Sequence, residues 1–87
     1  MGTALIAFSS STSANRLKRL AARERLQGVI LTQTPKSISQ NGCTYSLRFD
    51  MDLLSPMLAL ADQNHVGHGQ VYRETTDQTG RKSYQKL

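Results

Sequence analysis

The stretch TALIAF at residues 3–8 decides the fold. Its side chains are apolar on both sides of an extended chain, so a strand formed by them has two faces that need cover. A strand of this kind lies inside a sheet, with a neighbour along each edge. We therefore expect the rest of the chain to be arranged around residues 3–8.

A helix and a second strand are predicted after this central strand. The hydroxyl-rich run at residues 9–13 offers several N-caps, because a side-chain oxygen can accept from the free N–H groups of a starting helix. Residues 14–27 then have the apolar spacing of a helix, and Gly28 is predicted as its C-cap. The β-branched and apolar residues at 29–33 predict the second strand.

A long connection and a third strand come next. Residues 34–43 are mainly polar and contain turn-forming residues, so they are predicted as a loop. Residues 45–49 alternate in polarity, which is typical of a strand with one face on the core. Tyr45, Leu47 and Phe49 are expected to face that core.

The last third of the chain predicts a second helix and one or two further strands. Residues 50–64 have helical spacing, and Pro56 places the start of this helix within residues 50–55, because proline fits only a first turn. Residues 70–74 are predicted to form a strand. Residues 81–87 either pair back as a short edge strand or stay a mobile tail.

The order β-α-β-β-α-β predicts an α+β fold. Its commonest compact form is the split β-α-β sandwich, which is ferredoxin-like: an antiparallel sheet with two helices on one face, here with room for an extra C-terminal strand. We expect residues 1–87 to form a single domain, with the core in 1–74 and a hairpin arm or flexible tail in 75–87. A domain of this size hides roughly 60–65% of its unfolded surface. That thin core favours a carrier, a binding module or an accessory protein over a stand-alone enzyme.

Composition excludes several other classes. The chain has eleven Lys and Arg against six Asp and Glu, a net charge of +5, and one cysteine. One cysteine excludes an internal disulfide and a multi-cysteine zinc or iron–sulfur centre. A metal at His65 and His68 would need further ligands, for which Asp62 or Cys43 could be proposed. The Val66-Gly67 pair between the histidines instead indicates a flexible link from helix to strand, so no metal site is predicted. Neither an apolar run of ~18–20 residues nor a secretory pattern is present, so we expect a cytoplasmic protein without a membrane partner.

Cys43 follows Gly42 at a junction between loop and strand. A free cysteine is often a small buried apolar residue, but a junction of this kind also suits an accessible thiol. Lys36 and Arg48 could favour its reactive thiolate form. Because no second cysteine exists, the thiol is expected to hold a group rather than to exchange disulfides: an acyl group, a metal shared with another chain, or a sulfur or selenium atom.

The first predicted helix is strongly basic. It holds five of the eleven positive charges of the chain. These residues are Arg16, Lys18, Arg19, Arg23 and Arg25. They form either a solvated face whose aliphatic stems cover the core edge, or a binding surface for an acidic partner, RNA or protein. No aromatic residue lies between Ser9 and Cys43, so base stacking on RNA is not favoured.

Two stretches carry a resemblance to a known family. TPKSIS at residues 34–39 and GCTYSLRF at residues 42–49 resemble a small bacterial family of selenium/sulfur carrier-like proteins. Residues 4–10 and 70–73 look like the opening and closing strands of the same family, so the similarity covers nearly the whole chain. Members of the family often have glycine at the position of Thr44.

The resemblance implies a carrier whose acceptor thiol is Cys43. The thiol would hold a transient persulfide or selenide and need no other cofactor, and Gly42 would give access to it. Pro35 would fix the preceding connection. Side chains that could solvate or pair with the anion are Lys36, Ser37, Ser39 and Arg48. The implied partner is a cysteine desulfurase or another sulfur or selenium transfer protein.

Two other hypotheses stay open. The chain could be a non-catalytic interaction module that binds an acidic partner through the basic helix. It could also form a homo-oligomer through exposed sheet edges.

Overall fold

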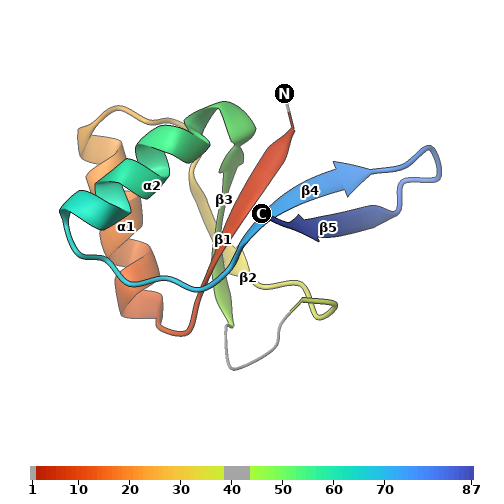
Figure 1. Cartoon of the computed structure of the whole chain (residues 1–87), viewed down its shortest axis with the longest axis horizontal. Coiled ribbons are helices and arrows are strands. Elements are labelled where there is room, and N and C mark those ends of the chain that lie inside the picture. Colours follow the sequence, from red (N-terminus) through yellow and green to blue (C-terminus); the bar gives the residue numbers. More distant parts are fainter. Residues whose placement is uncertain (1, 39–43) are drawn as a thin grey trace.

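In the computed structural model, residues 2–38 and 44–87 are described. They form one five-stranded sheet and two α-helices, with a short 3-10 helix before the second (Figure 1). The elements in chain order are β1 (Thr3–Phe8), α1 (Ser11–Arg23), β2 (Ile30–Gln33), β3 (Tyr45–Asp50), η1 (Met51–Leu53), α2 (Leu54–Gln63), β4 (Val71–Thr76) and β5 (Lys82–Lys86).

The strand order is β2-β3-β1-β4-β5, and every neighbouring pair is antiparallel. β1 therefore lies in the middle of the sheet, as its two apolar faces predict. Figure 1 shows both helices on one side of the sheet, which we call the helix face; the opposite side is the helix-free face. The predicted ferredoxin-like α+β arrangement is confirmed, with β5 as the additional strand.

The core lies between the helix face and the two helices. Ala4, Ile6 and Phe8 of β1 and the paired Leu47 and Phe49 of β3 are at most 2% exposed. The buried helix residues are Ala14, Leu17 and Ala21 of α1 and Met57, Leu60 and Ala61 of α2. The alternation predicted for β3 is confirmed, although its first residue, Tyr45, is 37% exposed at the end of the sheet.

The predicted end of the first helix is wrong. α1 ends at Arg23, and Arg25 rather than Gly28 takes the left-handed conformation that follows it, with φ of 59°. The Leu26 N–H donates to the Ala21 carbonyl at 2.9 Å, the hydrogen bond of a Schellman cap. Leu26 also packs against the core. The helix therefore ends where Leu26 can be packed against the core, although Gly28 would adopt the left-handed conformation at a lower steric cost than Arg25.

The second helix begins where its proline allows. η1 covers the first turn of the predicted segment, α2 starts at Leu54, and Pro56 is its third residue. Because the first-turn N–H groups of a helix have no partner within it, the missing N–H of Pro56 costs nothing there. Among the described residues, no helix is long and apolar enough to cross a membrane.

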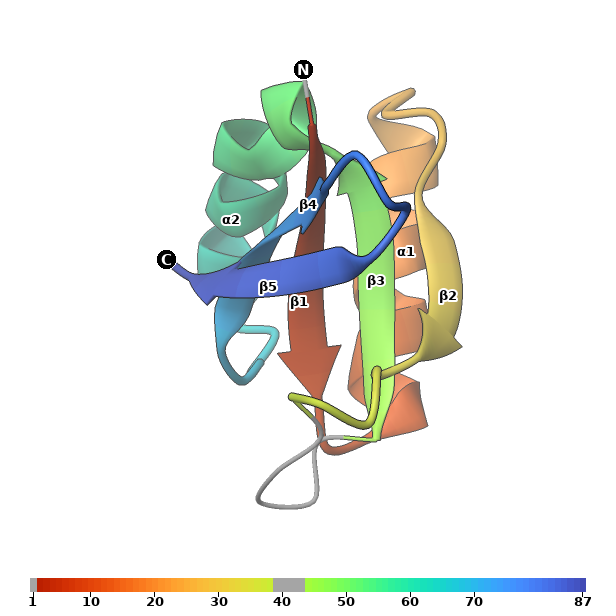
Figure 2. The same ribbon diagram turned by 90° about the vertical axis from the view of Figure 1, so that its right-hand side faces the viewer.

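The helix-free face is partly covered. Leu5 and Ala7 of β1 point to this face and are 1% and 2% exposed, and Ser46 of β3 is fully buried. Figure 1 shows the β4–β5 hairpin extending on this side, and in Figure 2 β5 crosses in front of β1 and β3. The C-terminal strand thus gives β1 cover on its second face.

Candidate functional site

The predicted site lies in the connection between β2 and β3. Cys43, Gly42 and Ser39 lie outside the described residues. The described part of the connection consists of residues 34–38 and Thr44, which stand at its two ends.

The two ends of this connection are held together. The Thr34 N–H donates to the Thr44 carbonyl at 2.9 Å. The hydroxyl groups of Thr34 and Ser46 also form a hydrogen bond of 2.7 Å, and both residues are buried. The connection therefore leaves and re-enters the sheet at one place, next to the exposed residue Thr44.

Three of the predicted supporting residues share a turn next to these two hydrogen bonds. They are Pro35, Lys36 and Ser37. The Ile38 N–H donates to the Pro35 carbonyl at 3.0 Å and closes the turn. Pro35 is half-buried, whereas Lys36 and Ser37 are exposed. The turn therefore presents an ammonium group and a hydroxyl to solvent at the start of the candidate loop.

Arg48 lies further along β3, about 13 Å of extended chain beyond Thr44. Its Nη2 atom donates to the Oε1 atom of Glu74 at 2.5 Å. In the sheet register, Arg48 of β3 is opposite Leu5 of β1, whereas Glu74 of β4 is opposite Thr3. The ion pair therefore crosses over β1, on the helix-free face.

Glu74 is the centre of a polar cluster that sequence reasoning missed. Besides Arg48, the Lys82 Nζ lies 3.9 Å from its carboxylate, and Tyr84 of β5 forms a side-chain hydrogen bond with it. Burial of the Tyr84 ring, the negative charge of Glu74 and this hydrogen bond raise the pKa of the Tyr84 phenol. The signal in the sequence was weak: Arg48 and Glu74 have opposite charges and each lies on a strand.

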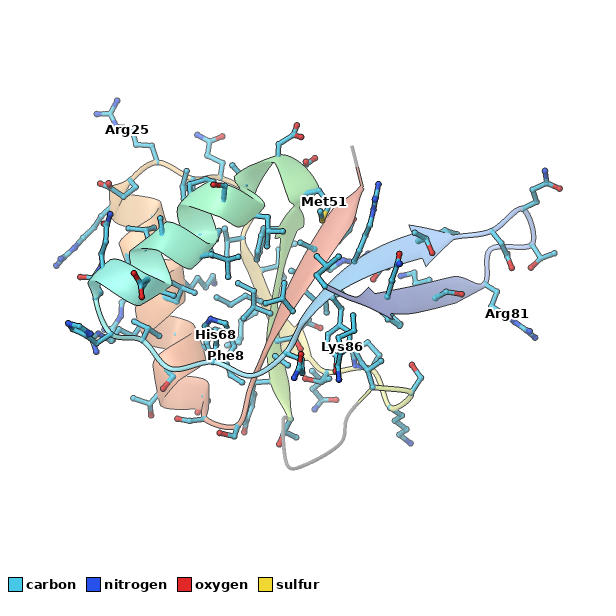
Figure 3. All side chains as sticks on the ribbon, viewed as in Figure 1. Phe8, Arg25, Met51, His68, Arg81 and Lys86 are labelled. Carbon is cyan, nitrogen blue, oxygen red and sulfur yellow. The ribbon has the colours of Figure 1, made fainter. Side chains whose placement is uncertain are left out.

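Among the described residues, no group of three His, Cys, Asp or Glu side chains could hold a metal ion, so His65 and His68 have no further ligands there. Both are exposed. His68 lies edge-on to Phe8, with ring centroids 6.4 Å apart (Figure 3). It lines a hollow of about 340 Å³ with the loop before α1. There the Ser10 side chain already accepts hydrogen bonds from the N–H groups of Thr12 and Ser13.

The basic residues of α1 and its C-terminal turn are all exposed. Two hollows flank the helix. One, of about 330 Å³, is lined by Arg16, Arg19 and Arg23 together with Leu20 and Asn64. The other, of about 400 Å³, is lined by Lys18, Ala22, Arg25, Leu26, Gln27, Gly28 and Val29. The basic residues predicted as a binding surface thus line a hollow on each side of the helix.

Residues 3–73 match the family model described as "Putative Se/S carrier protein-like". The match spans well over half of the chain. The chain belongs to the Se/S carrier-like family. The resemblance carried by residues 34–39 and 42–49 is thereby confirmed. No curated protein and no solved structure is significantly similar to it.

The matched part of this Se/S carrier-like protein runs from β1 into β4 and contains the whole β2–β3 connection, Cys43 included. It ends at Arg73, one residue before Glu74. The carboxylate that meets Arg48, together with β5 and Tyr84, therefore lies outside the matched region.

Proposed function

We propose that this protein carries one sulfur or selenium atom on Cys43, taken from a donor protein and passed to an acceptor. The observation that carries the proposal is the family match, which contains the entire β2–β3 connection and with it the only cysteine of the chain. A carrier needs one thiol and no partner cysteine, since a second thiol would release the bound atom by forming a disulfide.

The loading step conserves electrons. The Cys43 thiolate attacks the terminal sulfur of a persulfide on the donor, a new S–S bond forms on Cys43, and the S–S bond of the donor breaks. The donor leaves as a thiolate, so one sulfur atom has moved without net oxidation. A selenium atom moves in the same way through an S–Se bond. Unloading repeats the step with the thiolate of the acceptor as the attacking group.

The charge of the segment supports an anion on Cys43. Residues 34–49 contain no Asp or Glu but contain Lys36 and Arg48. The thiolate and the persulfide are both anions, and each is favoured by neighbouring positive charge. Arg48 is bonded to Glu74, so the exposed Lys36 is the cation we assign to this role.

Loading can be tested by intact-mass spectrometry. The protein is incubated with a cysteine desulfurase and free cysteine. We expect the mass of one sulfur atom to be added to the wild type, to be removed by a thiol reductant, and to be missing from Cys43→Ala. An unlabelled wild type, or equal labelling of Cys43→Ala, would contradict the proposal.

A relocated thiol provides the matched control. The variant Cys43→Ala/Ser37→Cys keeps one cysteine in the same connection, at a position that is exposed. If the donor recognises the position of Cys43 and does not simply label any exposed thiol, this variant should load at least about tenfold more slowly than the wild type. Equal rates would show that the donor labels any exposed thiol of this loop.

A further inference from the structure

The basic residues on the exposed side of α1 and its C-terminal turn outnumber the one carboxylate there, that of Glu24, and none of them forms an ion pair with a described carboxylate. The ion pairs among the described residues are those of Glu74 with Arg48 and Lys82, and none involves a basic residue of α1. Arg19 stands three residues after Arg16 and four before Arg23, so like charges are neighbours on the helix surface. Such pairs destabilise a helix. Within the described part of the chain, no ion pair offsets the repulsion between these arginines.

The centre of this exposed side is small and apolar. Ala22 is exposed, and its neighbours on the helix surface include Lys18 and Arg19 one turn earlier. Arg25 and the half-buried Leu26 follow it at the helix end, and all but Arg19 line the same hollow. Figure 3 shows Arg25 pointing outward from this end of the helix. A small apolar centre with a rim of cations lets another helix approach closely.

These features favour a protein partner over RNA. No aromatic residue lies on α1 or lines either hollow, so unpaired bases find no stacking platform. Ala22, Leu26 and Val29 instead offer contacts to apolar side chains. Protein–protein interfaces usually have an apolar centre and a polar rim, and arginine is enriched in them.

We infer that α1 docks an acidic amphipathic helix of a partner protein, whose apolar side chains meet Ala22 and Leu26 and whose carboxylates meet the flanking cations. The inference rests on α1 and the turn that follows it, and holds or fails independently of the chalcogen on Cys43. Where the proposed function also holds, the partner is a donor or an acceptor of the carried atom.

Two peptides of about 18 residues, or five helical turns, serve as probes. One has glutamates flanking a Leu/Ala stripe, and the other has the same glutamates flanking a Gln/Ala stripe. A mixed-sequence single-stranded RNA and a duplex RNA are titrated in parallel. Binding is measured by fluorescence anisotropy at about 0.15 M salt, where unspecific charge attraction is screened beyond ~8 Å.

Arg19→Glu is the decisive variant. It replaces two repulsive pairs by attractive ones, since the new carboxylate would stand three residues after Arg16 and four before Arg23, so the helix should remain folded. Arg81→Glu is the matched control, with the same change in net charge at the exposed tip of the β4–β5 hairpin, away from α1 (Figure 3).

We expect the Leu/Ala peptide to bind at least about fivefold more tightly than the Gln/Ala peptide. Arg19→Glu should weaken this binding about tenfold, and Arg81→Glu less than about twofold. Backbone amide shifts in the NMR spectrum should centre on Ala22. Equal losses in the two charge variants, equal affinity for the two peptides, or tighter binding of either RNA would overturn the inference.

Discussion

Glu74 is a nearly buried carboxylate, with a side chain only 5% exposed, on a sheet face that no helix covers. Burial of a charge is costly unless opposite charge or hydrogen bonds compensate it. Arg48 of β3 and Lys82 of β5 supply the charge, and Tyr84 supplies a hydrogen bond. Because these groups come from both sides of β4, Glu74 ties the C-terminal hairpin to the central strands.

The two partners of the ion pair differ in exposure, so their replacement should have unequal cost. Arg48→Met leaves the buried carboxylate without its nearest cation, whereas Glu74→Gln leaves an arginine that is 38% exposed and reaches water. We expect a loss of about 2 kcal/mol in the free energy of unfolding for Arg48→Met and about 1 kcal/mol for Glu74→Gln. Urea denaturation measures both, with the exposed Arg81→Met as a control that should be neutral. A smaller loss for Arg48→Met than for Glu74→Gln would contradict this description of the cluster.

The raised pKa of Tyr84 predicts a pH dependence of stability. Burial of the ring, helped by Glu74, favours the protonated phenol in the folded state. The folded state then binds more protons than the unfolded state once the pH exceeds about 10, so stability falls as the pH rises further. Below that pH, Tyr84→Phe should be less stable than the wild type by about 1 kcal/mol, because it lacks the hydrogen bond. Denaturation at about pH 9 and pH 11 should show this difference shrinking; a constant difference would refute the assignment.

At the scale of elements, the end of α1 shows where sequence patterns stop being decisive. Gly28 is an obvious C-cap by residue type, yet the chain turns at Arg25, because Leu26 is then placed on the core. Propensity predicts where a helix can end, whereas packing selects among the candidates. The burial of Leu47 and Phe49 in β3 was predictable, since it follows from the alternation within the strand itself, whereas Tyr45 is exposed where the strand begins.

Arg25→Gly should therefore stabilise the protein. An L-residue in the left-handed conformation carries a steric cost that glycine does not have, so we expect a gain of about 0.5–1 kcal/mol in the free energy of unfolding. Gly28→Ala gives the opposite test. Gly28 has φ of 79°, and a Cβ there would meet nothing within 4 Å, so its expected loss of about 1 kcal/mol comes from the backbone alone. Thermal or urea denaturation decides; a destabilised Arg25→Gly would contradict the strain argument.

For the whole molecule, the order and the periods of the elements sufficed to predict the ferredoxin-like arrangement. The position of the hairpin over the helix-free face could not be predicted in the same way. It involves pairing and side-chain contacts between distant parts of the chain, such as that of Arg48 with Glu74, which are 26 residues apart and share no local pattern. The candidate site follows from the sequence alone, because its single cysteine and its connection are contiguous; it stays a prediction, since Cys43 lies outside the described residues. The hydrogen bonds of Thr34 to Thr44 and Ser46 could not be predicted, since they depend on the register of β2 against β3.

A carrier must both accept and release its cargo, and one isotopically labelled sulfur atom can report both steps. The protein is loaded from a desulfurase with labelled cysteine, separated from the donor, and treated with cyanide, which takes the terminal sulfur of a persulfide as thiocyanate. Mass spectrometry follows the label on the Cys43 peptide and in thiocyanate. We predict one labelled atom per chain on that peptide, then equal loss from the peptide and gain in thiocyanate, and neither in Cys43→Ala. A label that never reaches Cys43, or that appears in thiocyanate to the same extent with Cys43→Ala, would contradict the carrier function.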